Sequence, residues 1–72
     1  MQHFLVCMQG THWKFTAHGV DRGPFKTQED ALREAIFAAR RASEDGEETE
    51  VLVQDETHTF RPSWRSTDVS AG

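Results

Sequence analysis

The sequence predicts a small α+β domain with the element order β-β-α-β(-β), in which a mostly antiparallel sheet carries one amphipathic helix on one face. Three observations predict it. Residues 12–18 alternate apolar and polar side chains, as a half-buried strand does. Residues 27–46 contain apolar side chains at helical spacing, and residues 50–55 return to strand-favouring valines and leucine.

Length and composition favour one globular domain. The chain has 72 residues, of which 36% are hydrophobic and 28% charged, which suits a single folded domain and argues against disorder. We expect this domain to span residues 1–65 and the small, polar residues 66–72 to form a disordered tail. A chain this short buries only about 60% of the surface that its unfolded form exposes, so association with a second copy is a plausible source of further stability.

Charge and cysteine content limit the function classes. The net charge of −4 is opposite in sign to that of most nucleic-acid-binding domains, so nucleic acid is an unfavoured partner. The single cysteine, Cys7, allows no internal disulfide, which suits a reducing cytoplasm. Residues 1–3 lack the basic region of a signal peptide, and the apolar run of residues 4–8 is too short to span a bilayer. We therefore expect a cytoplasmic protein without membrane contact.

The first two strands, at residues 3–8 and 12–18, predict a hairpin. A two-residue loop of Gly10 and Thr11 fits a type II′ turn, which favours glycine at its first position. A slip of one residue would bring Lys14 onto the apolar face. The predicted pairs on that face are Met8 with Trp13, Val6 with Phe15, and Phe4 with Ala17.

Residues 19–26 are expected to form a loop, because two glycines and a proline interrupt them. Thr27 then suits the N-cap of a helix, with Asp30 at the capping-box position and Gly46 as the stop. One helical stripe should cover the sheet, and it consists of Leu32, Ala35, Ile36 and Ala39.

The return strand at residues 50–55 should be followed by a short fourth strand at residues 58–61. A turn at residues 56–57 would set Val53 opposite Phe60, and Pro62 should end the strand. Since the helix reverses the chain after the hairpin, we expect the third strand to lie beside the first and antiparallel to it. The predicted sheet order is 2-1-3-4, with the helix on one face.

Several segments resemble a bacterial family. The strand at Trp13-Lys14-Phe15, the segment Phe25-Lys26-Thr27-Gln28-Glu29-Asp30-Ala31, the Ala- and Arg-rich helix and the strand Glu50-Val51-Leu52-Val53 are similar to the domain of unknown function 2188 family. The resemblance covers residues 3–64. That family has no assigned activity, so the resemblance implies a small cytoplasmic bacterial protein and no catalytic residue. The family tends to have Asp-Gly at the last turn, where this chain has Asp55-Glu56-Thr57.

A more distant similarity is to antitoxin domains of the HicB type, which also place a Thr-x-x-Glu/Asp-Ala helix start after a hairpin. In this chain the matching residues are Thr27, Asp30 and Ala31. This similarity implies an alternative function, in which the chain is an antitoxin-like regulator that binds a toxin protein, with DNA as a further partner.

The sequence favours no catalytic, metal or cofactor site. His3 and His18 should be cross-strand neighbours on the outer sheet face, with Cys7 on the same face, but a zinc site requires three or four ligands. We interpret these histidines as solvated. Cys7 has no flanking pattern of a nucleophile and is expected to be a half-buried thiol opposite Lys14.

Five residues have no place in the predicted core. Leu5, Cys7 and Leu52 share the outer sheet face, Phe37 lies opposite the apolar stripe of the helix, and Trp64 lies in the C-terminal segment. Small monomers rarely expose a large contiguous apolar patch, so we expect either the C-terminal segment with Trp64 to fold over one of these surfaces or a second subunit to cover it. The sequence therefore favours a non-enzymatic protein-interaction module that forms a homodimer, or binds another protein, through the outer sheet face.

Overall fold

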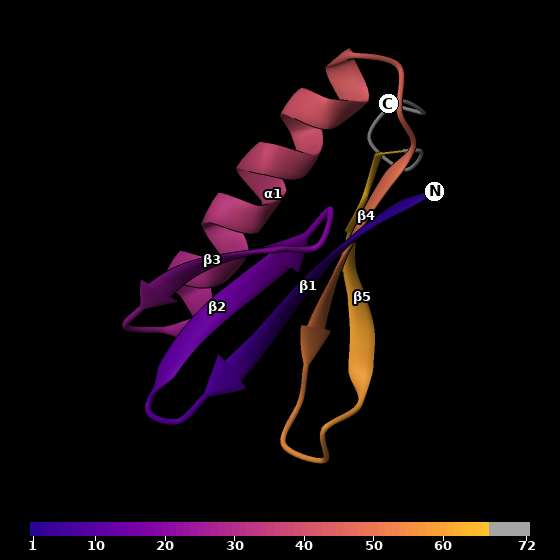
Figure 1. Ribbon diagram of the computed structural model, residues 1–72. Helices are drawn as coiled ribbons and strands as arrows, with labels where there is room; N and C mark the ends of the chain where they lie inside the picture. Colours follow the sequence, from indigo (N-terminus) through magenta and orange to yellow (C-terminus); the bar gives the residue numbers. More distant parts are fainter. Residues whose placement is uncertain (67–72) are drawn as a thin grey trace.

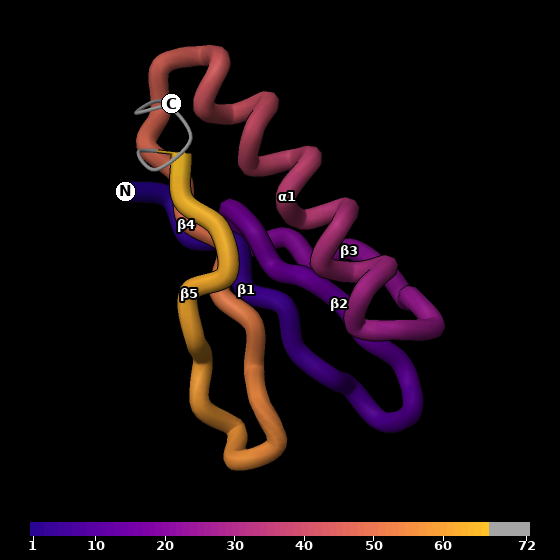
Figure 2. Tube along the Cα trace, turned by 180° about the vertical axis from the view of Figure 1, so that it is seen from behind, coloured from indigo at the N-terminus to yellow at the C-terminus, as the bar shows by residue number. Residues whose placement is uncertain are grey.

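The computed structural model describes residues 1–66, which form one five-stranded sheet and one helix (Figure 1). The strand order is β3-β2-β1-β4-β5. Figure 2 shows from behind that the helix crosses one side of the sheet diagonally. The α+β class is confirmed, with one strand more than expected. The elements are β1 (Gln2–Gln9), β2 (His12–Ala17), β3 (Val20–Phe25), α1 (Gln28–Glu44), β4 (Thr49–Gln54) and β5 (Phe60–Arg65).

The first hairpin has the predicted register. β1 and β2 pair antiparallel, with Val6 opposite Phe15 and Met8 opposite Trp13. Gly10 has a φ of +64° and no positive φ occurs at Thr11, as a type II′ turn requires. The apolar side chains of the hairpin therefore share the face that packs on the helix.

The expected loop at residues 19–26 is wrong, because Val20–Phe25 forms the edge strand β3. His18 and Gly19 both have positive φ, 55° and 74°, which gives the type I′ turn of a two-residue hairpin. Histidine is among the residues that adopt this conformation more readily than most. Pro24 is tolerated because edge strands leave one row of amides unpaired.

This additional strand reverses the expected direction of β4. β4 lies beside β1, as predicted, but runs parallel to it, with Phe4 opposite Val51 and Leu5 opposite Leu52. Because β3 reverses the chain once more before the helix, the strand that follows the helix, β4, runs in the direction of β1 and not in that of β2. The predicted neighbours were right and the predicted antiparallel pairing of these two strands was wrong.

Helix α1 begins and ends at the predicted signals. The Oγ1 of Thr27 accepts a hydrogen bond from the Asp30 amide at 3.1 Å, and Gly46 has a φ of +97° beyond the last turn. The face that packs on the sheet is rotated from the predicted stripe. Its fully buried residues are alanines at positions 31, 35 and 39, whereas Leu32 and Ile36 are only half-buried.

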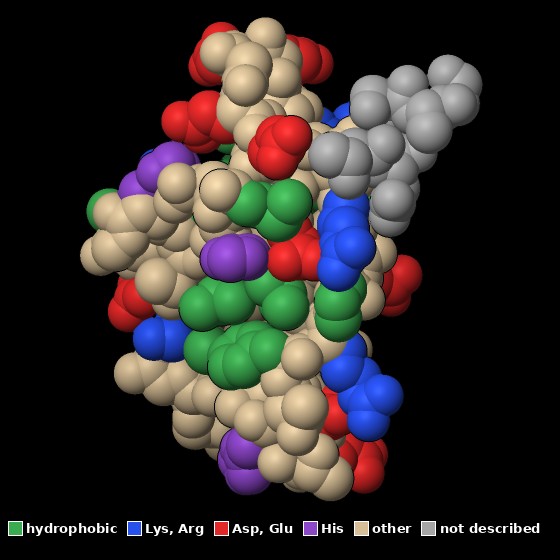
Figure 3. Space-filling view, turned by 90° about the vertical axis from the view of Figure 1, so that its right-hand side faces the viewer, with side chains coloured by type: hydrophobic (Ala, Val, Ile, Leu, Met, Phe, Trp, Pro, Cys, Tyr) green, Lys and Arg blue, Asp and Glu red, His purple; other side chains and the backbone are tan. Residues whose placement is uncertain are grey.

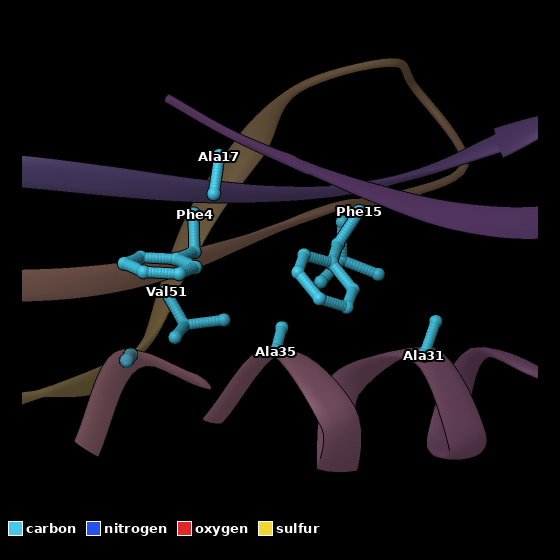
Figure 4. Packing of buried hydrophobic residues seen from close by; sticks show 8 residues of the cluster. Phe4, Phe15, Ala17, Ala31, Ala35 and Val51 are labelled. Atoms are coloured by element: carbon cyan, nitrogen blue, oxygen red, sulfur yellow. The ribbon is translucent and has the colours of Figure 1, made fainter. Parts of the chain in front are cut away.

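The core lies between this alanine face and the inner face of the sheet (Figure 4). Four larger side chains from three strands pack against the alanine methyl groups: Phe4, Val6, Phe15 and Val51. The small alanine side chains let the helix backbone approach the sheet closely. Thr49 is also buried here, and its hydroxyl donates a hydrogen bond to the Ala39 carbonyl at 3.0 Å.

The last hairpin forms with a loop one residue longer than predicted. His58 has a φ of +62°, so the loop of residues 56–58 has the left-handed third residue that is common in three-residue hairpins. Val53 therefore lies opposite Arg61, and Phe60 lies opposite Gln54. A shift of one residue moves Phe60 from the expected inner face to the outer face.

The carboxylate of Asp55 holds this turn together. Its Oδ1 accepts hydrogen bonds from the Thr57 and Thr59 amides at 2.9 and 3.0 Å, and its Oδ2 accepts one from Arg61 Nε at 2.7 Å. These bonds explain how the hairpin forms without a glycine.

The C-terminal boundary also differs from the expectation. Pro62 does not end β5, because the strand lies at the sheet edge and continues to Arg65. Ser66 accepts a hydrogen bond from the Thr49 amide at 3.0 Å, so it belongs to the folded domain. The remaining residues of the expected disordered tail, 67–72, lie outside the described part of the chain.

We predict that Ala35→Leu destabilises the fold by about 1–3 kcal/mol, because a larger side chain at this fully buried position forces the helix away from the sheet. Ala38→Leu is the matched control, since Ala38 is only half-buried. Urea unfolding of both variants measures the effect. Equal losses at the two positions would contradict the close packing of the alanine face.

We also predict that the acid sensitivity of the fold decreases in Asp55→Asn. Hydrogen bonds from Thr57, Arg61 and Thr59 hold the pKa of Asp55 well below its usual value. Since the folded-state pKa is lowered, this stabilisation is present above the unfolded-state pKa of about 3.9 and is lost as the pH falls toward the folded-state pKa. Urea midpoints between about pH 6 and 2 should fall less in the variant than in the wild type. Urea midpoints that fall by the same amount in both proteins over this pH range would contradict this prediction.

Candidate functional site

Helix α1 covers the inner face of the sheet and leaves the outer face open in the described part of the chain. Figure 3 looks onto the outer face and shows hydrophobic side chains at its centre, bordered by acidic, basic and histidine side chains. The strand pairing identifies the central residues, because alternate residues of a strand point to the same face. We call them the outer patch: Leu5, Cys7, Leu52, Phe60 and Pro62.

The middle of the outer patch is formed by residues on neighbouring strands. Leu5 lies opposite Leu52 in the parallel β1–β4 pair, and Leu52 lies opposite Pro62 in the β4–β5 pair. Leu5, Cys7 and Leu52 are half-buried, whereas Phe60 is 38% exposed. The fold thus gathers on one surface apolar side chains that come from three strands.

One border of the outer patch is an ion-pair cluster. Glu50 is only 6% exposed although it lies on the outer face. Its carboxylate accepts a hydrogen bond from Arg65 Nε, and the His3 Nε2 atom lies 3.3 Å from its Oε1. Removing a nearly buried carboxylate from water is costly without such partners, and Arg65 supplies the charged partner of Glu50.

The opposite border is a second polar cluster, on β2 and β3. Asp21 accepts hydrogen bonds from Lys14 Nζ at 3.0 Å and from Thr16 Oγ1 at 2.7 Å. The bond from Thr16, followed by that from Lys14, lowers the pKa of Asp21, and the bond to Asp21 raises the pKa of Lys14. Both groups are therefore firmly charged near neutral pH.

The expected pairing of histidines is wrong. His3 contacts Glu50, whereas the ring of His18 stacks edge-on against Phe4, with ring centroids 5.8 Å apart. Because Phe4 is buried on the inner side of the sheet, His18 does not share the outer face with His3. Within residues 1–66, no three histidine, cysteine or carboxylate side chains are grouped as a metal site requires.

Cys7 lies opposite Lys14, as predicted, and is half-buried. Its place in the outer patch is that of a small apolar side chain.

Over the described residues, α1 is too short and too polar to cross a membrane.

Two of the five predicted interaction residues lie away from the outer patch, and the sequence already placed one of them, Phe37, on the helix. Phe37 is 58% exposed on the helix, with the Arg41 guanidinium 5.8 Å from its ring centroid. Trp64 lies opposite Val51 and packs against the inner core. Sequence reasoning missed Pro62 and Arg65 on the outer face, because Pro62 was taken as the end of its strand.

Comparison of the chain with family models, with curated proteins and with solved structures found no match.

We predict that Arg65→Met destabilises the fold by about 1–3 kcal/mol, because it removes the charged donor from the nearly buried Glu50 carboxylate. The double variant Glu50→Gln, Arg65→Met should recover part of this loss, since no charge is then left without a partner. Urea unfolding of the two variants and the wild type gives the comparison. A double variant that is less stable than Arg65→Met would contradict this interpretation.

Proposed function

We propose that the chain is a non-enzymatic interaction module that forms a homodimer through the outer face of its sheet. The observation that carries this proposal is the pair Leu5 and Leu52, at the centre of an apolar surface that no described element covers. A small domain gains stability by burying such a surface. The reducing cytoplasm expected from the single cysteine, Cys7, belongs to the same proposal.

The dimensions of the face suit a second copy of the same sheet. Five strands spaced about 4.8 Å apart, with six residues of about 3.3 Å each, give a surface of roughly 19 by 20 Å. Two sheets pack face to face at about 10 Å. Counted on both copies, this area is roughly 760 Å², which is below the range of stable interfaces and typical of weak, transient ones, so we expect a dimer that dissociates at low concentration.

The charges at the borders are complementary under two-fold symmetry. The β2–β3 border presents Lys14 and Asp21, and the β4–β5 border presents Glu50 and Arg65. A two-fold axis parallel to the strands places the β3 edge of one copy over the β5 edge of the other. With this axis along β1, the Leu5 side chains of the two copies meet at the centre, Leu52 faces β2 of the second copy, and Asp21 lies over the edge strand that carries Arg65.

An antitoxin-like regulator is the second candidate. The observation in its favour is the helix start itself: Thr27 caps α1 through Asp30, and Ala31 is the first fully buried helix residue. In this proposal the outer face binds a toxin protein of basic charge, opposite in sign to this chain with its net charge of −4. A chain that remains monomeric alone but binds a small basic protein through the outer patch would favour this function over the homodimer.

We predict that Leu52→Asp weakens dimerisation at least about tenfold, because it places a charge in the centre of the buried patch. Met8→Asp is the matched control, since Met8 is 51% exposed and lies on the inner side of the sheet. Analytical ultracentrifugation from about 1 to 100 µM measures the dissociation constants. Circular dichroism establishes that both variants remain folded.

The wild type and Met8→Asp should form dimers over this range, and Leu52→Asp should remain monomeric. A wild type that stays monomeric at about 100 µM, or a dimer that is unaffected by Leu52→Asp, would contradict the homodimer proposal.

A further inference from the structure

A groove on the other side of the molecule is lined by most of the chain's phenylalanines. It runs between α1 and the strands β2 and β3 and has a volume of about 660 Å³. The chain contains five phenylalanines, and four of them line this groove: Phe4, Phe15, Phe25 and Phe37. Phe15 and Phe25 stack with ring centroids 6.0 Å apart and form its floor.

The groove exists because one helix crosses a wide sheet diagonally. Alanines bring α1 close to β1 and β4, whereas the edge strand β3 contributes no fully buried residue to the core. Val20 and Phe37 line the groove, from β3 and from the helix, and are 52% and 58% exposed. The groove is therefore open to solvent while its floor belongs to the core.

The rim of the groove carries positive charge. Arg22 lies opposite Phe15 on β3 and thus on the inner side of the sheet, and Arg41 projects from the helix over the Phe37 ring. His18 closes one end against Phe4. Among the described residues that line the groove, Glu34 is the one acidic residue. In a chain with a net charge of −4, this local excess of arginine favours an anionic ligand.

We propose that this groove binds a small amphipathic organic anion, with an aromatic or alkyl body against the phenylalanines and one carboxylate or sulfonate group between Arg22 and Arg41. The volume lies within the usual range for small-molecule sites, and arginine suits the recognition of such anions. A peptide is a less suitable occupant, because Gly23 and Pro24 interrupt the β3 edge on which a further strand would have to pair.

The test uses 1-anilinonaphthalene-8-sulfonate as the probe and its uncharged analogue N-phenyl-1-naphthylamine as the comparison. Fluorescence titration should show that the anion binds the wild type at least about tenfold more tightly than the uncharged analogue. The double variant Arg22→Gln, Arg41→Gln should lose this preference. Arg40→Gln is the control for Arg41, because Arg40 lies beside it in sequence but lines a different surface of the helix.

The position of binding is tested separately. Amide chemical shifts should change in residues 18–25 and 34–42, and binding should persist in Leu52→Asp, which carries no substitution in the groove. The proposal is overturned if the anion does not bind, if the double arginine variant binds it as well as the wild type does, or if the shifts map to the outer patch. Because the groove and the outer patch are on opposite sides of the sheet, failure of this proposal leaves the homodimer proposal intact.

Discussion

The pairing of β1 on both of its edges is the constraint on which the rest of the structure depends. β1 is antiparallel to β2 and parallel to β4, and its alternate residues Phe4 and Val6 are buried under the helix. The alanine face of α1 can approach this strand closely because it has no large side chains there. The same strand supplies Leu5 and Cys7 to the opposite face, so one element fixes both the core and the outer patch.

A single helix on a five-stranded sheet leaves two surfaces of different chemistry. The outer patch is apolar at its centre and bordered by charges of both signs, which suits another copy of the same surface. The groove beside α1 is concave and aromatic, and its rim is mainly basic, which suits a small anion. Both surfaces have the same cause. One helix is about 10 Å wide and neighbouring strands are about 4.8 Å apart, so a single helix covers only part of one face of a five-stranded sheet.

Local signals in the sequence predicted much of this structure. The alternation of residues 12–18, the glycine at position 10 and the cap at Thr27 identified the hairpin and the helix. β3 was missed because Gly23 and Pro24 indicate a loop, although an edge strand accepts both. That one omission reversed the predicted direction of β4. The alternation also placed Leu5, Cys7 and Leu52 on one face, but the partnership of Glu50 with Arg65 depends on a β5 strand that continues past Pro62.

Native-state hydrogen exchange of the backbone amides tests the central role of β1 most directly. The amides of β1 that bond to β2 or β4 should exchange only through global unfolding and should be among the slowest in the domain, whereas those of the edge strands β3 and β5 should exchange faster through local opening. Exchange from β1 as fast as exchange from β3 would show that β1 is not held on both edges and would contradict the account.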